Sequence, residues 1–177
     1  MNNTEQENSP GTDVIFSAED AQWMAYALQL ATKGEAIGEV PVGAVIVQDE
    51  KIIGEGFNQP ISSHDPTAHA EIIALRQAAA LVQNYRLVGS TIYVTLEPCT
   101  MCVGALVHAR IARLVFGTAE SKAGAVVSKS QLLDNDYFNH QVDYSGGLMA
   151  QQCQHQLSNF FVMRREQKRQ EKLKALK

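Results

Sequence analysis

The chain has 177 residues, of which 45 % are hydrophobic, a size and composition typical of one globular domain with a full core. No apolar run approaches the roughly 18 to 20 residues that span a bilayer, and the first residues lack a signal-peptide pattern, so we expect a cytoplasmic protein that does not enter a membrane. The formal net charge is −4, yet residues 164–177 carry seven Lys or Arg against two Glu, so the acidic balance does not exclude a nucleic-acid partner.

Helix and strand patterns alternate along an expected domain of residues 17–163. A disordered leader is expected at residues 1–16, and a basic helix end or tail at residues 164–177. In chain order, the expected elements are a helix from a Ser17 cap to Gly34, strands over 42–47 and 52–57, a helix over 68–82, a strand over 91–96, a helix over 99–109, a strand over 113–116, a helical turn near Leu132, a strand over 141–144 and a helix after Gly147.

The order of these elements predicts the fold class α/β, as a three-layer α/β/α sandwich around a mixed five-stranded sheet. The first two strands form an antiparallel hairpin around the turn at residues 49–51. The strands at 91–96 and 113–116 are joined by a helix, which implies a right-handed crossover between parallel strands. Thr67 is the expected cap of the second helix, and Pro98 is the expected first residue of the third.

Three potential metal ligands lie at expected helix starts. Cys99 and Cys102 are three residues apart on one helix face, where the positive end of the helix dipole lowers thiol pKa values and favours a divalent cation. His69, at the start of another helix, supplies a third ligand. A tetrahedral zinc with three protein ligands keeps its fourth position for water, so the sequence predicts one zinc ion with an open position.

Glu71 follows His69 by two residues and is the expected catalytic proton carrier. On a regular helix the two side chains would lie about 200° apart around the axis, but in the first turn this separation lets the imidazole bind the metal while the carboxylate approaches the bound water. Each residue alone has a simpler interpretation: a loop histidine, an acid that stabilises the helix dipole and, for the two cysteines, a structural zinc knuckle. Together, His-x-Glu followed by Pro-Cys-x-x-Cys is the signature of zinc-dependent nucleobase deaminases.

The match extends beyond this signature, and over about residues 17–170 the chain resembles the bacterial tRNA-specific adenosine deaminases of the cytidine/deoxycytidylate deaminase superfamily. The matching stretches are Pro41-Val-Gly-Ala44, Asn58, Asp65-Pro-Thr-Ala-His-Ala-Glu71, Thr95-Leu-Glu-Pro-Cys-Thr-Met-Cys102, Gly104-Ala-Leu-Val-His-Ala-Arg110, Val115-Phe-Gly117 and Phe160-Phe-Val-Met-Arg-Arg165. The resemblance implies a cytidine-deaminase-like fold, zinc, and hydrolysis of the wobble adenosine of tRNA to inosine. In that reaction water attacks C6 of adenine while Glu71 moves the protons.

The resemblance also implies substrate contacts and partners. The residues it implies around the base are Val40, Pro41, Asn58 and Ala70, and the candidates for RNA contact are Glu120, Phe161, Arg164, Arg165, Lys168 and Arg169. The implied partners are tRNA and a second copy of the chain. Two positions depart from the family pattern in the loop near bound RNA: Glu120 stands where relatives often have Asp, and the stretch 126–128 is bulkier than usual.

Two other functions fit part of these features. A zinc deaminase of a free base or nucleoside, such as guanine, cytosine or cytidine, would share the zinc signature but has no use for a basic tail. A zinc-stabilised interaction module without activity would need a fourth protein ligand and no carboxylate beside the metal. The basic tail itself is open to a simpler interpretation as a solvated helix end. Glu97, just before Pro98, either orients the zinc loop through a hydrogen bond or only caps.

Overall fold

The structure is a computed structural model that describes residues 15–175. Five strands form one sheet in the order β2-β1-β3-β4-β5, in which β1 is antiparallel to β2 and β3, whereas β4 is parallel to β3 and β5. The mixed five-stranded sheet predicted from the sequence is therefore confirmed. The elements are α1 (Ala18–Ala36), β1 (Gly43–Gln48), β2 (Lys51–Phe57), α2 (Pro60–Ser63), α3 (Ala70–Val82), β3 (Thr91–Leu96), α4 (Thr100–His108), β4 (Arg113–Thr118), the 3-10 turn η1 (Leu132–Asp134), β5 (Asp143–Gly146) and α5 (Ala150–Ala175).

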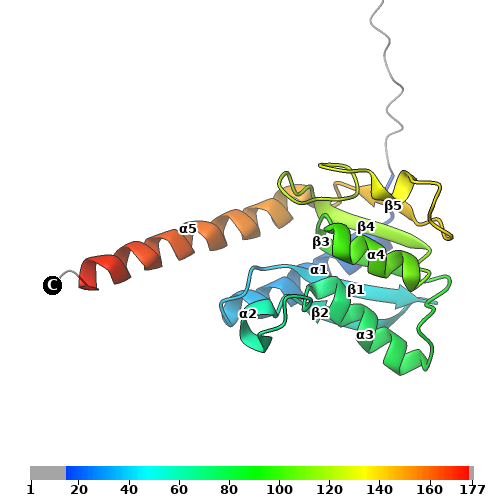
Figure 1. Cartoon of the computed structure of the whole chain (residues 1–177), viewed down its shortest axis with the longest axis horizontal. Coiled ribbons are helices and arrows are strands. Elements are labelled where there is room, and N and C mark those ends of the chain that lie inside the picture. Colours follow the sequence, from blue (N-terminus) through cyan, green and yellow to red (C-terminus); the bar gives the residue numbers. More distant parts are fainter. Residues whose placement is uncertain (1–14, 176–177) are drawn as a thin grey trace, which may run out of the picture.

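Helices cover both faces of the sheet, as Figure 1 shows. Side chains of α3 and α4 pack with one face of the central strands in the larger hydrophobic cluster. Side chains of α1 and the start of α5 pack against the other face. Alternation along β1 divides the strand between the two clusters, because Ala44 and Ile46 belong to the first and Val45 and Val47 to the second. This arrangement is the expected α/β/α sandwich.

Two glycines in β2 allow α3 to lie directly against the sheet. A Cβ atom at Gly54 would be 2.3 Å from the carbonyl oxygen of Ala74, and one at Gly56 would be 2.4 Å from that of Ala70. These distances are shorter than any van der Waals contact, so only glycine fits at these positions. Gly56 thereby fixes how closely the first turn of α3 approaches the sheet.

Several element ends differ from the predicted ones. The first helix continues past Gly34 to Ala36. The helix predicted over 68–82 is α3, and its N-cap residue is His69 and not Thr67. The Thr67 hydroxyl and amide both donate to Asp65 Oδ1. The predicted last strand, over 141–144, is displaced by two residues, since residues 143–146 are the ones that pair along β4.

The helix α4, predicted over 99–109, also begins later than predicted. Cys99 is its N-cap, so Pro98 precedes the helix instead of opening it. The basic segment 164–177 is helical as far as Ala175, as part of α5, which extends well past the sheet (Figure 1). Most of the expected leader, residues 1–14, lies outside the described residues. Between residues 15 and 175, each helix is too short or too polar to cross a bilayer.

Candidate active site

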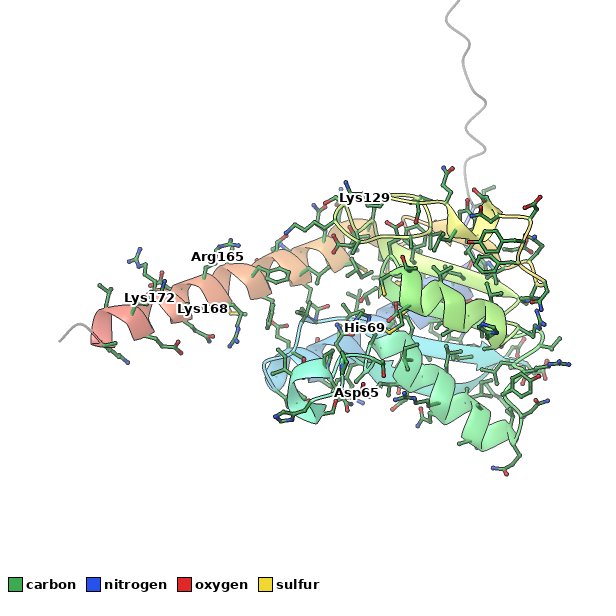
Figure 2. All side chains as sticks on the ribbon, viewed as in Figure 1. Asp65, His69, Lys129, Arg165, Lys168 and Lys172 are labelled. Atoms are coloured by element: carbon green, nitrogen blue, oxygen red, sulfur yellow. The ribbon has the colours of Figure 1, made fainter. Side chains whose placement is uncertain are left out.

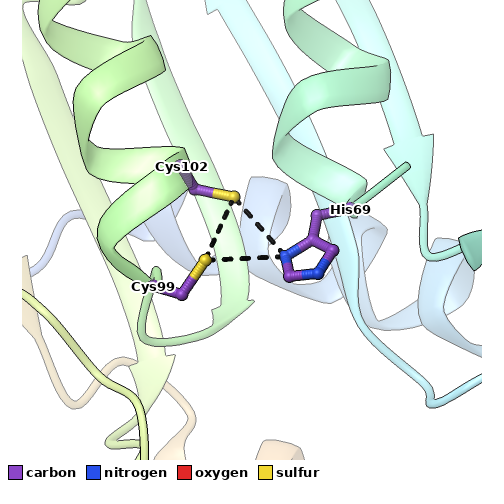
Figure 3. Close-up of side chains that lie close together, drawn as sticks. All are labelled: His69, Cys99 and Cys102. Atoms are coloured by element: carbon purple, nitrogen blue, oxygen red, sulfur yellow. Dashed lines mark hydrogen bonds between the residues drawn. The ribbon is translucent and has the colours of Figure 1, made fainter. Parts of the chain in front are cut away.

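Three predicted metal ligands meet where α3 and α4 begin. His69 and Cys99 are the N-caps of these two helices, and Cys102 lies in the first turn of α4. The imidazole Nδ1 is 3.7 Å from Cys99 Sγ and 3.6 Å from Cys102 Sγ, and the two sulfurs are 3.8 Å apart (Figure 3). The structure therefore brings the imidazole of His69 together with two thiols that lie 30 and 33 positions further along the chain.

The spacing of these donors fits a zinc ion. Bond lengths of about 2.3 Å for Zn–S and about 2.0 to 2.1 Å for Zn–N, at tetrahedral angles, place two sulfurs about 3.8 Å apart and each sulfur about 3.6 Å from the nitrogen. The observed separations agree with these values. Within residues 15–175, no fourth His, Cys, Asp or Glu donor joins the group. The site thus has the three-ligand pattern of a catalytic zinc and lacks the closed shell that a structural zinc module needs.

The three ligands differ in their electrostatics. A hydrogen bond with the Cys102 thiol, aided by the neighbouring His69 ring, lowers the pKa of Cys99 to about 3. Hydrogen bonding with Cys99 raises the pKa of Cys102 and also raises the pKa of His69. Cys99 therefore supplies a thiolate, the form that binds metal, whereas Cys102 and His69 would release protons as a metal ion binds.

Glu71 lies in the first turn of α3 and is buried, with 4 % of its surface exposed. Burial raises the pKa of its carboxyl group. The separation of about 200° between His69 and Glu71 would hold on a regular helix, but His69 precedes the helix and its backbone is extended, with φ −73° and ψ 154°. Both side chains therefore line the same cavity, and Glu71 is placed beside the metal ligands without being one of them.

A cavity of about 250 Å³ opens in front of these residues. Val40 and Asn58 line it, whereas Pro41 and Ala70, also predicted to contact the base, are buried behind the lining. Asn58 Oδ1 accepts the backbone amide of Ala70 at 2.9 Å, so this side chain also anchors the start of α3. Of the RNA-contact candidates, Glu120 lines this cavity.

Glu97 is a cavity residue whose role the sequence left open between orienting and capping. It is 2 % exposed, and its carboxylate accepts hydrogen bonds from the segment 120–128. Burial alone would raise its pKa, but the hydrogen bonds from Ser128 and from backbone amides lower it. In the sequence, Glu97 is marked by its position as an acidic residue directly after an apolar strand.

A second cavity, of about 240 Å³, lies between α5 and the segments around Gly38 and Ile61. Val40 lines both cavities, so they are neighbours. Among its other lining residues are four RNA-contact candidates: Phe161, Arg164, Arg165 and Lys168. Figure 2 labels two of these residues, Arg165 and Lys168, on the part of α5 that extends past the sheet. Arg169 does not line this cavity, and its guanidinium pairs with Glu166 at 3.5 Å.

Comparisons with known proteins agree with this geometry. The model of the cytidine and deoxycytidylate deaminase zinc-binding region matches residues 17–118. The tRNA-specific adenosine deaminase of Haemophilus influenzae is 56 % identical over 92 % of this chain and 95 % of its own, and that of Streptococcus pyogenes serotype M1 is 40 % identical over 85 % of this chain and 88 % of its own.

A solved structure from work on A-to-I editing by tRNA:A34 deaminases at the wobble position of transfer RNA also matches. Its TM-score is 0.74 at 38 % identity, over 76 % of this chain and 98 % of that chain. The solved structure shares the fold, and all three relatives match this protein over most of their length. The chain therefore belongs to the zinc-dependent cytidine and deoxycytidylate deaminase superfamily and, within it, to the bacterial tRNA-specific adenosine deaminases.

Proposed function

We propose that this protein hydrolyses the wobble adenosine in the anticodon loop of tRNA to inosine. The observation that carries the proposal is a buried carboxylate, Glu71, beside a three-ligand zinc site in a cavity that adjoins a second, aromatic and basic one. The named relatives act on tRNA, as their names state. A free-base deaminase would have no need of the second cavity.

Different residues of the chain have separate roles in the reaction. His69, Cys99 and Cys102 would hold a zinc ion, which would lower the pKa of a bound water toward neutrality. Glu71 accepts a proton from that water and delivers it to N1 of adenine. It then accepts the remaining proton of the oxygen bound to C6 and delivers it to the departing nitrogen. The oxygen of water forms a bond to C6 as the bond to the amine breaks, so the products are inosine and ammonia. Asn58 and Val40 line the cavity and hold the base there.

The substrate must present a base that is not stacked in a helix. The cavity is formed between two helix starts and the loop that contains Glu120, so only a base splayed out of its strand reaches Glu71. A nucleotide next to that base would meet the second cavity, where Phe161 offers a stacking surface and Arg164, Arg165 and Lys168 offer charges to phosphates. An anticodon loop satisfies both requirements.

The test is to incubate purified protein with total bacterial tRNA and, separately, with free adenosine, guanine, cytosine and cytidine. We expect inosine in the tRNA and no ammonia from the small molecules. The variant Glu71→Ala should keep its zinc and fold yet lose at least the 10²- to 10⁴-fold that a general acid-base typically contributes, about 3 to 5 kcal/mol. Deamination of a free base alone would refute the proposal, and loss of zinc in the variant would make Glu71 a ligand.

We further propose a cytoplasmic homodimer. Family membership supports two copies, and several apolar side chains near the end of α3 and after it are well exposed, among them Leu81, Tyr85 and Val88 at 64 % each. The reducing cytoplasm keeps the ligand thiols free and contains the substrate RNA. Light scattering on the purified protein measures its mass in solution. A mass of 19.4 kDa would show a monomer and contradict the proposed dimer.

A further inference from the structure

We infer that Glu97 is a positioning residue that holds the segment 120–128, called here the wall loop, as one side of the base cavity. The inference rests on the proposed function, because it concerns how the same cavity keeps its shape. Glu97 follows the last residue of β3, and its own amide donates to the carbonyl of Thr118 at 2.9 Å. The carboxylate therefore projects from a fixed point at the carboxyl end of the central strand.

The carboxylate is the hydrogen-bonding centre of the wall loop. Oε1 accepts the backbone amides of Val126, Val127 and Ser128 at 3.0, 2.7 and 2.9 Å. Oε2 accepts the amide of Glu120 at 2.9 Å and the hydroxyl of Ser128. Both ends of the loop are thus tied to the two oxygens of one side chain.

Only an ionised carboxylate satisfies all of these donors. It accepts at both oxygens and donates nowhere, whereas an amide side chain places a donor at one of the two positions. Glu97 is 2 % exposed, so solvent does not replace a missing acceptor easily. Replacing Glu97 with Gln should keep the three bonds at Oε1 and turn Nε2 toward the amide of Glu120, where two donors oppose each other.

The held segment matters to the substrate because part of it faces the cavity. Glu120 and Ala123 line the cavity together with Glu97. The loop also packs tightly on the carboxylate: a Cβ atom at Gly124 would lie 2.3 Å from Glu97 Cδ and Oε2. The shape of this side of the cavity therefore depends on the contact between Glu97 and the loop backbone.

The first experiment measures the loop without any substrate. Amide hydrogen exchange is recorded by NMR on the zinc-loaded full chain and on Glu97→Gln and Glu97→Ala. In Glu97→Gln we expect exchange at Glu120 to rise about 10-fold or more while Val127 changes little, and in Glu97→Ala we expect both to rise. Equal protection in all three proteins would overturn the inference. This result does not depend on which substrate the enzyme uses.

The second experiment measures turnover of an anticodon stem-loop. A displaced wall weakens contacts made equally before and during reaction, so KM should rise about 10- to 100-fold in the Glu97 variants while kcat and zinc content stay within about threefold. A fall in both kcat and zinc content would instead show that Glu97 acts through the ligand Cys99. Absence of inosine with the unaltered protein would refute the proposed function and leave the exchange result standing.

Gly124 provides a test from the opposite side of the contact. Gly124→Ala should raise KM because its methyl group collides with the carboxylate of Glu97, and the same substitution in the Glu97→Ala background should add almost nothing. Gly104→Ala is the matched control, because a Cβ at Gly104 meets no atom within 4 Å. Additive effects of the two substitutions would show that Gly124 acts independently of Glu97 and would contradict the inference.

Discussion

Asp20 accepts four hydrogen bonds, three of which connect the first helix to the sheet. Its buried carboxylate accepts both guanidinium nitrogens of Arg113, at 2.7 and 3.1 Å, the hydroxyl of Tyr93 at 2.8 Å and the amide of Ser17 at 3.0 Å. These partners come from β4, β3 and the N-cap of α1. We predict that Asp20→Asn destabilises the protein by about 2 kcal/mol at neutral pH.

The magnitude follows from the titration of the carboxyl group. Burial alone would raise the pKa of Asp20, but Arg113, Ser17 and Tyr93 lower it from 3.8 to about 2. That difference corresponds to about 2 kcal/mol of stability. Because the pKa is lower in the folded state, the contribution is complete above the unfolded value and disappears as the pH falls toward the folded value. About half of it should be lost at about pH 3.

Urea unfolding of both proteins between pH 7 and pH 3 tests this reasoning. The free-energy difference should be about 2 kcal/mol at pH 7 and shrink by about half at pH 3. Glu19→Gln is the matched control in the same helical turn, because Glu19 is exposed and bonded only to Trp23, and it should change stability by less than about 0.5 kcal/mol. A difference between Asp20→Asn and the unaltered protein that is independent of pH would refute the argument.

Three further predictions concern zinc, the basic helix and the packing of α3. Chelation of zinc should abolish inosine formation and lower the melting temperature, because the ion joins the starts of α3 and α4; an unchanged calorimetric transition would contradict this. Alanine at Arg164, Arg165 and Lys168 should reduce the salt slope of tRNA binding by somewhat under about one unit for each phosphate that is no longer neutralised, as measured by Kd titrations at several salt concentrations, whereas alanine at the exposed Lys51 should leave the slope unchanged. Gly56→Ala should cost about 1 to 3 kcal/mol in urea unfolding because its methyl group meets the carbonyl of Ala70, and an unchanged stability would show that α3 shifts freely.

Most of the fold could be predicted because its elements have strong local patterns. The hairpin, the helix after each ligand-bearing loop and the alternation of strands and helices along the chain all follow from apolar periodicity and turn residues. The element ends were less predictable, since they depend on contacts between distant residues. The start of α3 is an example: Asn58 accepts the amide of Ala70, and no local pattern shows this bond.

The zinc ligands were predictable for a different reason. Histidine and paired cysteines at helix starts have few uses other than metal binding, so residue type and spacing carry the information. The contacts of Glu97 carry no such signal, because all but one of the donors to its carboxylate in the described segment are backbone amides, which any sequence supplies. The neighbouring cavity on α5 was also hidden, since Val40 and Ile61 reach it from segments whose positions depend on the whole fold.

The bulky residues at 126 and 127 illustrate what side-chain placement adds to a sequence pattern. Val126 is fully buried in the hydrophobic cluster under α4, whereas Val127 is 44 % exposed. Neither side chain lines the base cavity, and both residues bond to Glu97 through their backbone amides. The extra bulk is therefore accommodated without narrowing the cavity. Glu120 differs in this respect, because it lines the cavity itself, so of these departures from the family pattern it is the one placed to alter substrate recognition.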